Sequence, residues 1–348
     1  MKRYIPIAAV IVFVIAALAF GNHLLVLKKQ AAAQAAYEAE RHLVVYSDMP
    51  EDVNRNLAAA FHKRTGLRVQ IQTRTDDELY TLWRSDGKEG PPAVLIASEP
   101  VLREQKAHQV LRPYASQFTE SVPYPQKDSD AMWTGLWLDP MVFIIHNEYY
   151  ARRGMHIRTW DDLLTDPTLR VAFPDLAATD MAGDFLCSFV EVKGTEAAGL
   201  YLKALQSHIS MYSKVMAANV RRVAGGEADI GIVDGATARQ YRQDGMPIYI
   251  VYPRDGTSYW LTGAAVTKWC RDDELAQAFM DWLYSRDVDD VLRGSHLYLT
   301  YANSDARKIL DSRGQELILF PVQKQYTGEG RRDLQDWWIK SVRFGKGE

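Results

Sequence analysis

Residues 133–147 read W-T-G-L-W-L-D-P-M-V-F-I-I-H-N, and this stretch decides how the rest of the chain is interpreted. Residues 141–145 within it are a continuous apolar run between Asp139-Pro140 and His146-Asn147. A short run of this kind is typical of a strand buried on both faces. The run is either an interior strand of one large sheet or a hinge strand that carries the chain from one lobe into a second. We favour the hinge.

The composition is that of an ordinary globular chain with the length of two domains. The 348 residues suffice for two domains of roughly 150 residues, each with its own core. Hydrophobic residues make up 47% of the chain and charged residues 24%, which excludes wholesale disorder. The net charge of -3 offers no basic surface for nucleic acid, so we expect no nucleic-acid partner.

The N-terminus indicates export. Lys2-Arg3 precede residues 5–20, which carry no charge. With Ala17-Leu18-Ala19 as a small-residue cleavage site, the segment would be a signal peptide. If it is not cleaved, residues 4–27 are long enough to cross about 30 Å of hydrocarbon as a transmembrane anchor. We slightly favour the anchor, and both interpretations export the rest of the chain.

Beyond residue 41 the chain alternates strands and helices. Residues 42–46 are predicted to form a short strand, residues 52–65 a helix, and residues 67–73 a half-exposed strand. Buried strands recur at residues 93–97 and 230–233, with helical patterns between them. This alternation predicts an α/β fold.

Several short stretches together carry a resemblance to a known family. They are 44–47 (V-V-Y-S), 93–98 (A-V-L-I-A-S), 143–147 (F-I-I-H-N), 160–163 (W-D-D-L), 173–175 (F-P-D), 226–231 (G-E-A-D-I-G), 253–257 (P-R-D-G-T) and 278–285 (A-F-M-D-W-L-Y-S). In this order the chain, from about residue 43 to 292, resembles the solute-binding proteins of bacterial ABC importers. The relevant class is two-lobed, the type II class, and includes binders of ferric iron, thiamine, polyamines, phosphonates and sugar phosphates.

The resemblance implies two Rossmann-like α/β lobes joined by two crossover hinge strands, residues 141–145 and roughly 260–267. Lobe 1 would comprise residues 42–140 plus 260–348, and lobe 2 residues 141–259. Residues 1–30 would be the signal peptide or anchor and 31–41 a spacer.

The implied role is the solute-binding component of an ABC importer, in the periplasm or on the outer face of the cytoplasmic membrane. Its expected partners are a small-molecule solute, the membrane permease and, through residues 4–27, the membrane. We expect a monomer without a cofactor. Ligands of open α/β sheets bind beyond the carboxyl ends of strands, beside helix N-termini, which supports a site in the cleft between the lobes.

The candidate ligand-binding residues lie in loops that follow strands. They are Ser47, Asp48, Ser98, Glu99, Asp139, Thr179, Asp180, Asp234, Thr257 and Tyr259. Each could instead serve as a helix cap or turn residue, because Ser, Asp and Thr side chains satisfy free backbone N–H groups. We expect Asp139, just before the apolar run, to contact solute.

Two solute chemistries compete for these loops. Free helix N-termini with Ser47, Ser98 and Thr179 would suit a phosphonate or sugar phosphate. Clustered carboxylates beside Trp133, Trp137, Tyr259 and Trp260 would suit an organic cation such as a polyamine or thiamine. The loops carry no arginine other than Arg254. We therefore favour a cationic solute.

Ferric iron is a third solute. The iron-binding branch of the family places two adjacent tyrosines after the strand that follows the Gly-Glu motif. Here that position reads Asp234-Gly-Ala-Thr237, so those oxygen ligands are missing. We expect no metal site in these loops.

An enzyme and a sensor are the competing classes of protein. The chain has no G-x-S-x-G elbow, no P-loop and no G-x-G-x-x-G, and its eight histidines include no pair three or four residues apart. We therefore expect no enzymatic activity. A membrane-tethered ligand sensor would use the same fold and would retain the N-terminal anchor.

The two cysteines, Cys187 and Cys270, fit neither a metal motif nor a redox C-x-x-C. A disulfide is arithmetically allowed. We expect two buried thiols, because the implied fold places them in different lobes.

Overall fold

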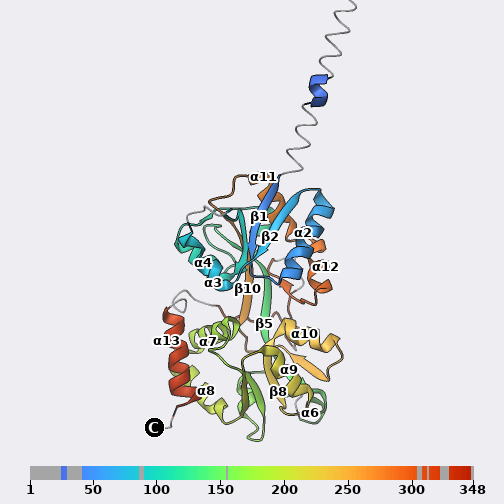
Figure 1. Ribbon diagram of the computed structural model, residues 1–348. Helices are drawn as coiled ribbons and strands as arrows, with labels where there is room; N and C mark the ends of the chain where they lie inside the picture. The colour runs from blue at the N-terminus through green and yellow to red at the C-terminus, as the bar shows by residue number, and fades with distance from the viewer. Residues whose placement is uncertain are drawn as a thin grey trace, which may run out of the picture.

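The computed structural model describes residues 25–29, 41–85, 90–153, 156–303, 308–311, 313–321 and 329–345. The chain forms two α/β lobes, one above the other in Figure 1, with strands β5 (Thr134–His146) and β10 (Tyr259–Thr267) at their junction. The predicted fold class, two α/β lobes joined by two hinge strands, is confirmed.

The predicted signal peptide or anchor and the spacer lie largely outside the described residues. Only residues 25–29, which are helical, and residue 41 are described in that region. Among the described helices, none combines the length and the apolar character needed to cross a bilayer.

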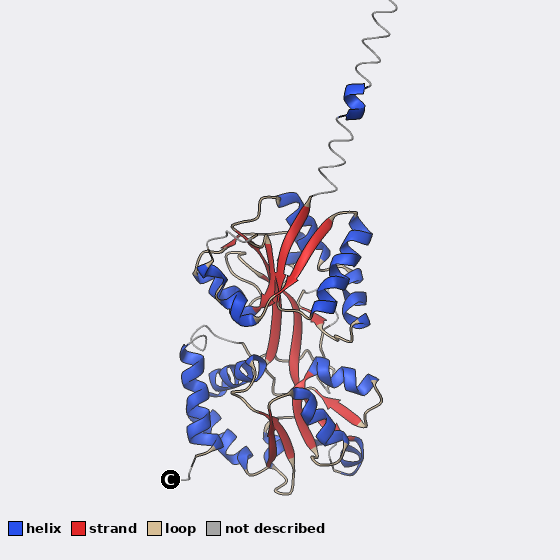
Figure 2. Cartoon of the chain, in the orientation of Figure 1, coloured by secondary structure: helices blue, strands red, loops and turns tan. Residues whose placement is uncertain are grey.

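Lobe 1 is a mixed sheet covered by helices on both faces. Strand β1 (His42–Ser47) runs parallel to β2 (Arg68–Thr73) and β3 (Val94–Ser98), and β10 joins β3 in antiparallel orientation. Helices α2 (Glu51–Thr65), α11 (Asp273–Trp282) and α12 (Arg286–Gly294) cover one face, while α3 (Asp76–Tyr80) and α4 (Glu99–Ala107) cover the other (Figure 2). Val53, Leu57 and Phe61 show why α2 packs here, since their spacing puts three buried side chains on one stripe.

Lobe 2 repeats the arrangement. Strand β6 (Val171–Pro174) runs parallel to β7 (Ile209–Ser213) and β8 (Ile230–Asp234), while β8 and β9 (Ile248–Val251) are antiparallel to β5. One face carries α7 (Asp180–Lys193) and α8 (Thr195–Gln206), and the other α9 (Met216–Ala224) and α10 (Gly235–Gln243). The shorter elements are η1 (Leu82–Arg84), β4 (Leu111–Arg112), α5 (Gln117–Glu120), α6 (Asn147–Arg152), η3 (Asp161–Leu164) and β11 (Thr300–Tyr301).

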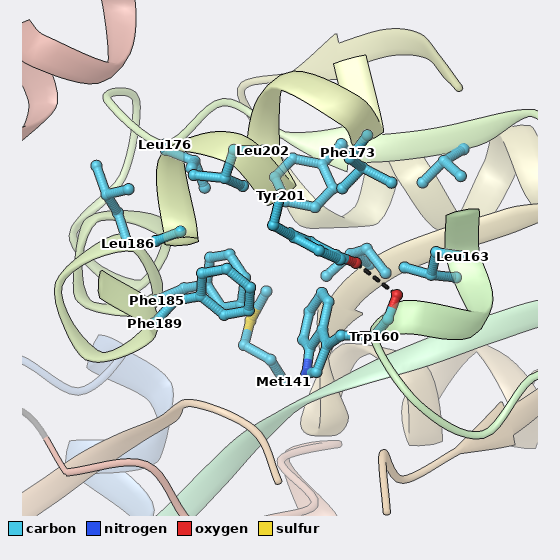
Figure 3. Packing of buried hydrophobic residues seen from close by; sticks show 14 of the residues in the cluster. Met141, Trp160, Leu163, Phe173, Leu176, Phe185, Leu186, Phe189, Tyr201 and Leu202 are labelled. Carbon is cyan, nitrogen blue, oxygen red and sulfur yellow. Dashed lines mark hydrogen bonds between the residues drawn. The ribbon is translucent and has the colours of Figure 1, made fainter. Parts of the chain in front are cut away.

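An aromatic cluster fills the core of lobe 2 (Figure 3). The Trp160 ring lies edge-on to Phe143, with centroids 4.8 Å apart, and 5.0 Å from Phe185. The Tyr201 hydroxyl donates a hydrogen bond of 2.5 Å to the Trp160 carbonyl oxygen. Burying these large rings makes lobe 2 a unit with its own core.

Strand β5 belongs to both lobes. Its first part pairs with β10, ending at Pro140 opposite Tyr259, and its second part pairs with β8, starting at Met141 opposite Asp234. The expectation that residues 141–145 make the crossing is therefore corrected, because this run is the lobe 2 portion of β5 and the crossing is at Pro140–Met141. Continuous apolar sequence records burial, and because β5 is buried from Thr134 to Ile145 this pattern does not mark the point at which the chain changes lobes.

The C-terminal segment packs on lobe 2. Helix α13 (Glu329–Trp338) and the turn η5 (Ile339–Arg343) contribute Leu334, Trp338 and Val342 to the lobe 2 cluster. Figure 1 shows α13 beside α7 and α8. The prediction that residues 260–348 all belong to lobe 1 is wrong for this segment, because its apolar stripe is buried against lobe 2.

The two cysteines are buried thiols in different cores. Cys187 belongs to the lobe 2 cluster and Cys270 to the lobe 1 cluster. Burial raises the pKa of Cys187 to about 12, which keeps this thiol protonated at neutral pH.

Candidate functional site

The carboxyl ends of β1 and β3 bring three predicted residues together. The backbone N–H of Ser98 donates to Asp48 Oδ2 at 2.8 Å, and the Ser47 hydroxyl accepts from the Met49 N–H at 3.1 Å. Burial and the neighbouring Asp76 carboxylate raise the pKa of Asp48 to about 7. Ser47, Asp48 and Ser98 therefore lie together at the carboxyl ends of these two strands.

Glu99 is buried and already has a cationic partner. Its Oε1 accepts from Arg103 Nε at 2.7 Å, and the Arg103 guanidinium lies 5.2 Å from the centre of the Trp133 ring. Burial raises the pKa of Glu99, and the adjacent arginine opposes that rise. Glu99 thus forms an ion pair with Arg103, and the Arg103 guanidinium lies over the buried Trp133 ring.

Asp139 and Asp234 meet at the start of α10. Asp139 Oδ1 accepts from the Ala236 N–H at 2.8 Å, and Asp234 Oδ1 accepts from the Thr237 N–H at 2.7 Å. Burial and the nearby Asp234 carboxylate raise the pKa of Asp139 well above its usual value. Arg239 lies 3.7 Å from Asp139. Both carboxylates make the contacts of helix caps at the lobe crossing.

Thr257 and Tyr259 are part of the hinge. The Thr257 hydroxyl donates to the Met141 carbonyl oxygen at 2.9 Å and is fully buried. Burial raises the pKa of Tyr259, and the nearby Glu99 carboxylate adds to that rise. These contacts connect the two crossing segments.

Thr179 and Asp180 lie at the start of α7 in lobe 2. The Thr179 hydroxyl accepts from the Ala182 N–H at 3.2 Å as the helix N-cap. Asp180 is the first residue of α7, and its side chain is outside the described part of the structure.

A cavity of about 250 Å³ lies where α3 and β3 of lobe 1 face α13 of lobe 2. Its lining comprises Asp76, Asp77, Tyr80, Ser98, Pro100, Val101, Trp260, Arg331, Arg332 and Gln335. Two of the lining residues, Ser98 and Trp260, come from the loops and aromatic residues predicted from the sequence. Pockets between lobes are the preferred places for small ligands, so this cavity is the candidate solute site.

Sequence reasoning missed both charged walls of this cavity. The α3 wall carried a usable signal, since Thr75 and Glu78 form a capping box and start the helix directly after strand β2. The α13 wall carried none, because nothing in residues 329–338 indicates the lobe on which the helix packs.

The two walls carry opposite charge. Asp76 and Asp77 lie on α3, and Asp76 interacts with Asp48. On α13, Arg331 Nη1 donates to the buried Asp184 carboxylate at 2.8 Å. Groups on both sides of the cavity affect the pKa of Tyr80. Burial and the Glu104 carboxylate raise this pKa, and the guanidinium groups of α13 oppose the rise.

A second, larger cavity of about 750 Å³ also involves both lobes. Arg239 and Tyr252 line it from lobe 2, and Arg286, Tyr298 and Tyr301 are among the residues that line it from lobe 1. Arg239 donates to the Tyr252 hydroxyl at 2.8 Å and to the Tyr298 carbonyl oxygen. The cavity is lined by none of the predicted site residues, although Arg239 connects it to Asp139.

The described side chains include no group of three or more His, Cys, Asp or Glu residues placed to hold a metal ion. Asp234 through Thr237, the position at which the iron-binding branch carries tyrosines, forms the capped start of α10.

Comparisons with known proteins agree with this architecture. The Fe(3+)-binding periplasmic protein of Serratia marcescens is 23% identical over 281 residues, which cover 76% of this chain and 80% of that protein. The spermidine/putrescine-binding periplasmic protein of Salmonella typhimurium is 23% identical over 325 residues, which cover 87% and 90%. The periplasmic binding protein AfuA from Actinobacillus pleuropneumoniae, with exogenous fructose-6-phosphate bound, has a TM-score of 0.66 at 20% identity over 87% of this chain and 99% of that chain.

A family match covers most of the chain. Residues 43–297 match the family described as bacterial extracellular solute-binding protein. The match runs from β1 to just beyond α12. The chain therefore belongs to the bacterial extracellular solute-binding proteins.

Proposed function

We propose that this solute-binding protein captures a small organic solute with a positively charged group in the cavity between α3 and α13. The observation that carries the proposal is the wall formed by Asp76 and Asp77, with the aromatic side chains of Tyr80 and Trp260 in the same lining. Carboxylates and aromatic faces together bind organic cations. A match to a spermidine/putrescine-binding protein supports this solute class.

The other carboxylates described above already have partners, which reduces the number of residues that could bind the solute. Glu99 pairs with Arg103, Asp175 with Arg343 at 2.5 Å, and Asp139 and Asp234 cap α10. A carboxylate that already has a buried partner attracts a solute cation less strongly. Asp77 is exposed and forms no ion pair within the described ranges, so it is the carboxylate we assign to the solute.

The test compares binding by the native protein and by Asp77→Asn. We expect polyamines to raise the melting temperature of the native protein, because a ligand that binds only the folded state stabilises it. Asp77→Asn should weaken polyamine binding about tenfold or more, since a charged hydrogen bond contributes roughly 1.5–3 kcal/mol. Asp244→Asn, an exposed carboxylate at the end of α10, is the control and should bind as the native protein does.

A phosphorylated solute is the second candidate. Arg332 and Gln335 line the same cavity, and the neighbour from Actinobacillus pleuropneumoniae was solved with a sugar phosphate. A response to sugar phosphates with none to organic cations would replace the first candidate by the second.

A further inference from the structure

The two walls of the 250 Å³ cavity belong to different lobes and carry opposite charge. Asp76 and Asp77 lie on α3 in lobe 1, while Arg331 and Arg332 lie on α13, which is packed on lobe 2. The solute that occupies this space therefore meets an acidic surface on one side and a basic surface on the other.

Each wall is held firmly in its own lobe. Gln105 Nε2 donates to the carbonyl oxygens of Leu79 and Tyr80 at 2.9 and 3.0 Å, which fixes α3 against α4. On the other side, Gln335 Nε2 donates to the Leu176 carbonyl oxygen at 3.0 Å, and the fully buried Trp338 anchors α13. Each charged helix is therefore anchored in its own lobe, so a movement of the lobes changes the separation of the two walls.

Asp77 and Arg332 are the charges most available to a solute. Arg331 is occupied by Asp184, and Asp76 interacts with Asp48. Asp77 and Arg332 are both exposed, and within the described ranges neither forms an ion pair. One acid and one base thus face the cavity from opposite lobes.

The size of the cavity limits the solute. About 250 Å³ is slightly below the roughly 300–1,000 Å³ of pockets for drug-sized ligands. A small solute therefore suits this cavity.

We propose that the solute is a small zwitterion whose ammonium group meets Asp77 and whose carboxylate meets Arg332. Closure of the lobes removes the walls from water, and a buried charge without a partner is costly. A dication would leave Arg332 facing positive charge, and a dianion would leave Asp77 facing negative charge. A zwitterion matches both walls and bridges the lobes. This inference rests on the proposed function, since it keeps the cation on α3 and adds an anion on α13.

The experiment titrates the protein with three four-carbon probes in a calorimeter: putrescine, 4-aminobutyrate and succinate. The end groups of the three probes differ in charge, whereas the probes have similar lengths. We expect 4-aminobutyrate to bind at least tenfold more tightly than the other two. Asp77→Asn and Arg332→Gln should each weaken 4-aminobutyrate about tenfold, and Arg332→Gln should tighten putrescine. Lys340→Gln, an exposed charge further along the C-terminal segment, is the matched control and should leave all three affinities unchanged.

Two outcomes would overturn the inference in distinguishable ways. Tighter binding of putrescine than of 4-aminobutyrate, unaltered by Arg332→Gln, would remove the anionic end and leave the proposed cation-binding function standing. Tightest binding of succinate, unaltered by Asp77→Asn, would overturn the zwitterion and the cation together. Circular dichroism of each variant checks that the variant is still folded, so that a loss of affinity can be assigned to the substituted side chain.

Discussion

At the scale of single residues, the fold changes the ionisation of the carboxyl group of Asp48, which lies beside Asp76. Asp48 is held between the Ser98 N–H, which favours its charged form, and the burial and Asp76 charge that oppose it. The balance leaves its pKa at about 7, against about 3.9 in an unfolded chain. Between these two values the folded protein binds a proton that the unfolded chain releases.

This difference predicts a pH dependence of stability. Because the folded state binds more protons between about pH 4 and pH 7, the contribution of Asp48 to the free energy of unfolding falls as pH rises through that window. The fall is at most about 4 kcal/mol. We expect Asp48→Asn to gain stability relative to the native protein as pH rises from 4.5 to 7.5, as measured by urea denaturation. Parallel curves for the two proteins would show that the carboxyl pair does not share a proton.

At the scale of elements, the C-terminal helix and the hinge strands bring together segments that are distant in the sequence. Helix α13 is fixed to lobe 2 by apolar packing and by Arg331–Asp184, while Arg343 pairs with Asp175. Between the two strands, a β-bulge at Leu136 of β5 brings Gly135 opposite Gly263 of β10. Side chains are excluded at both glycines because the neighbouring backbone is too close.

The docking of α13 is tested with its two tryptophans. Trp338 is fully buried and lies edge-on to Tyr212 at 5.5 Å, so Trp338→Ala should lower the free energy of unfolding by about 3–5 kcal/mol. Trp337 is only partly buried and packs against Gly199. Trp337→Ala should therefore lower the free energy of unfolding clearly less than Trp338→Ala does. Equal effects of the two substitutions in chemical denaturation would contradict the placement of α13.

The hinge glycine makes a second prediction. A Cβ at Gly263 would lie 2.6 Å from the Thr134 carbonyl oxygen, so Gly263→Ala must push β5 and β10 apart and should cost about 1–3 kcal/mol or more. A Cβ added at Gly294, at the end of α12, would meet no atom within 4 Å. Gly294→Ala is the control and should be neutral or stabilising, by up to about 1 kcal/mol. Melting temperatures of the two variants test this prediction, and equal melting temperatures for Gly263→Ala and Gly294→Ala would contradict it.

At the scale of the whole molecule, the protein is two separately packed lobes linked through β5 and β10. Such a design allows hinge closure around a solute, which suits an extracytoplasmic solute-binding protein that presents its loaded form to an ABC permease. The thiols of Cys187 and Cys270 report on this division, because each lies in the core of a different lobe.

Thiol titration checks the division. In the native protein, both cysteines should resist a thiol reagent, since Cys187 is fully buried and Cys270 is 8% exposed. In denaturant without reductant, two thiols per chain should react. Fewer than two would reveal a disulfide and contradict the separation of the cores.

Local patterns in the sequence were enough for the fold class and the family, whereas the position of the first crossing, at Pro140–Met141, came from the structure. The alternation of strands and helices and the buried run at residues 141–145 record burial, and burial is written into neighbouring residues. The same patterns located Ser98 and Trp260, which line the candidate cavity. The contact of Asp139 with solute stays a prediction, because a carboxylate after a strand looks the same in the sequence whether it binds a ligand or caps a helix, and here Asp139 accepts from the Ala236 N–H of α10.

The sequence by itself therefore determined the two-lobed α/β architecture and the family. Only the tertiary structure decided which charges remain available there. Asp184 meets Arg331 147 residues away, and Asp175 meets Arg343 168 residues away. The physical reason is that periodicity reports how deeply a side chain is buried, whereas the partner of a charge depends on which remote segments the fold brings into contact.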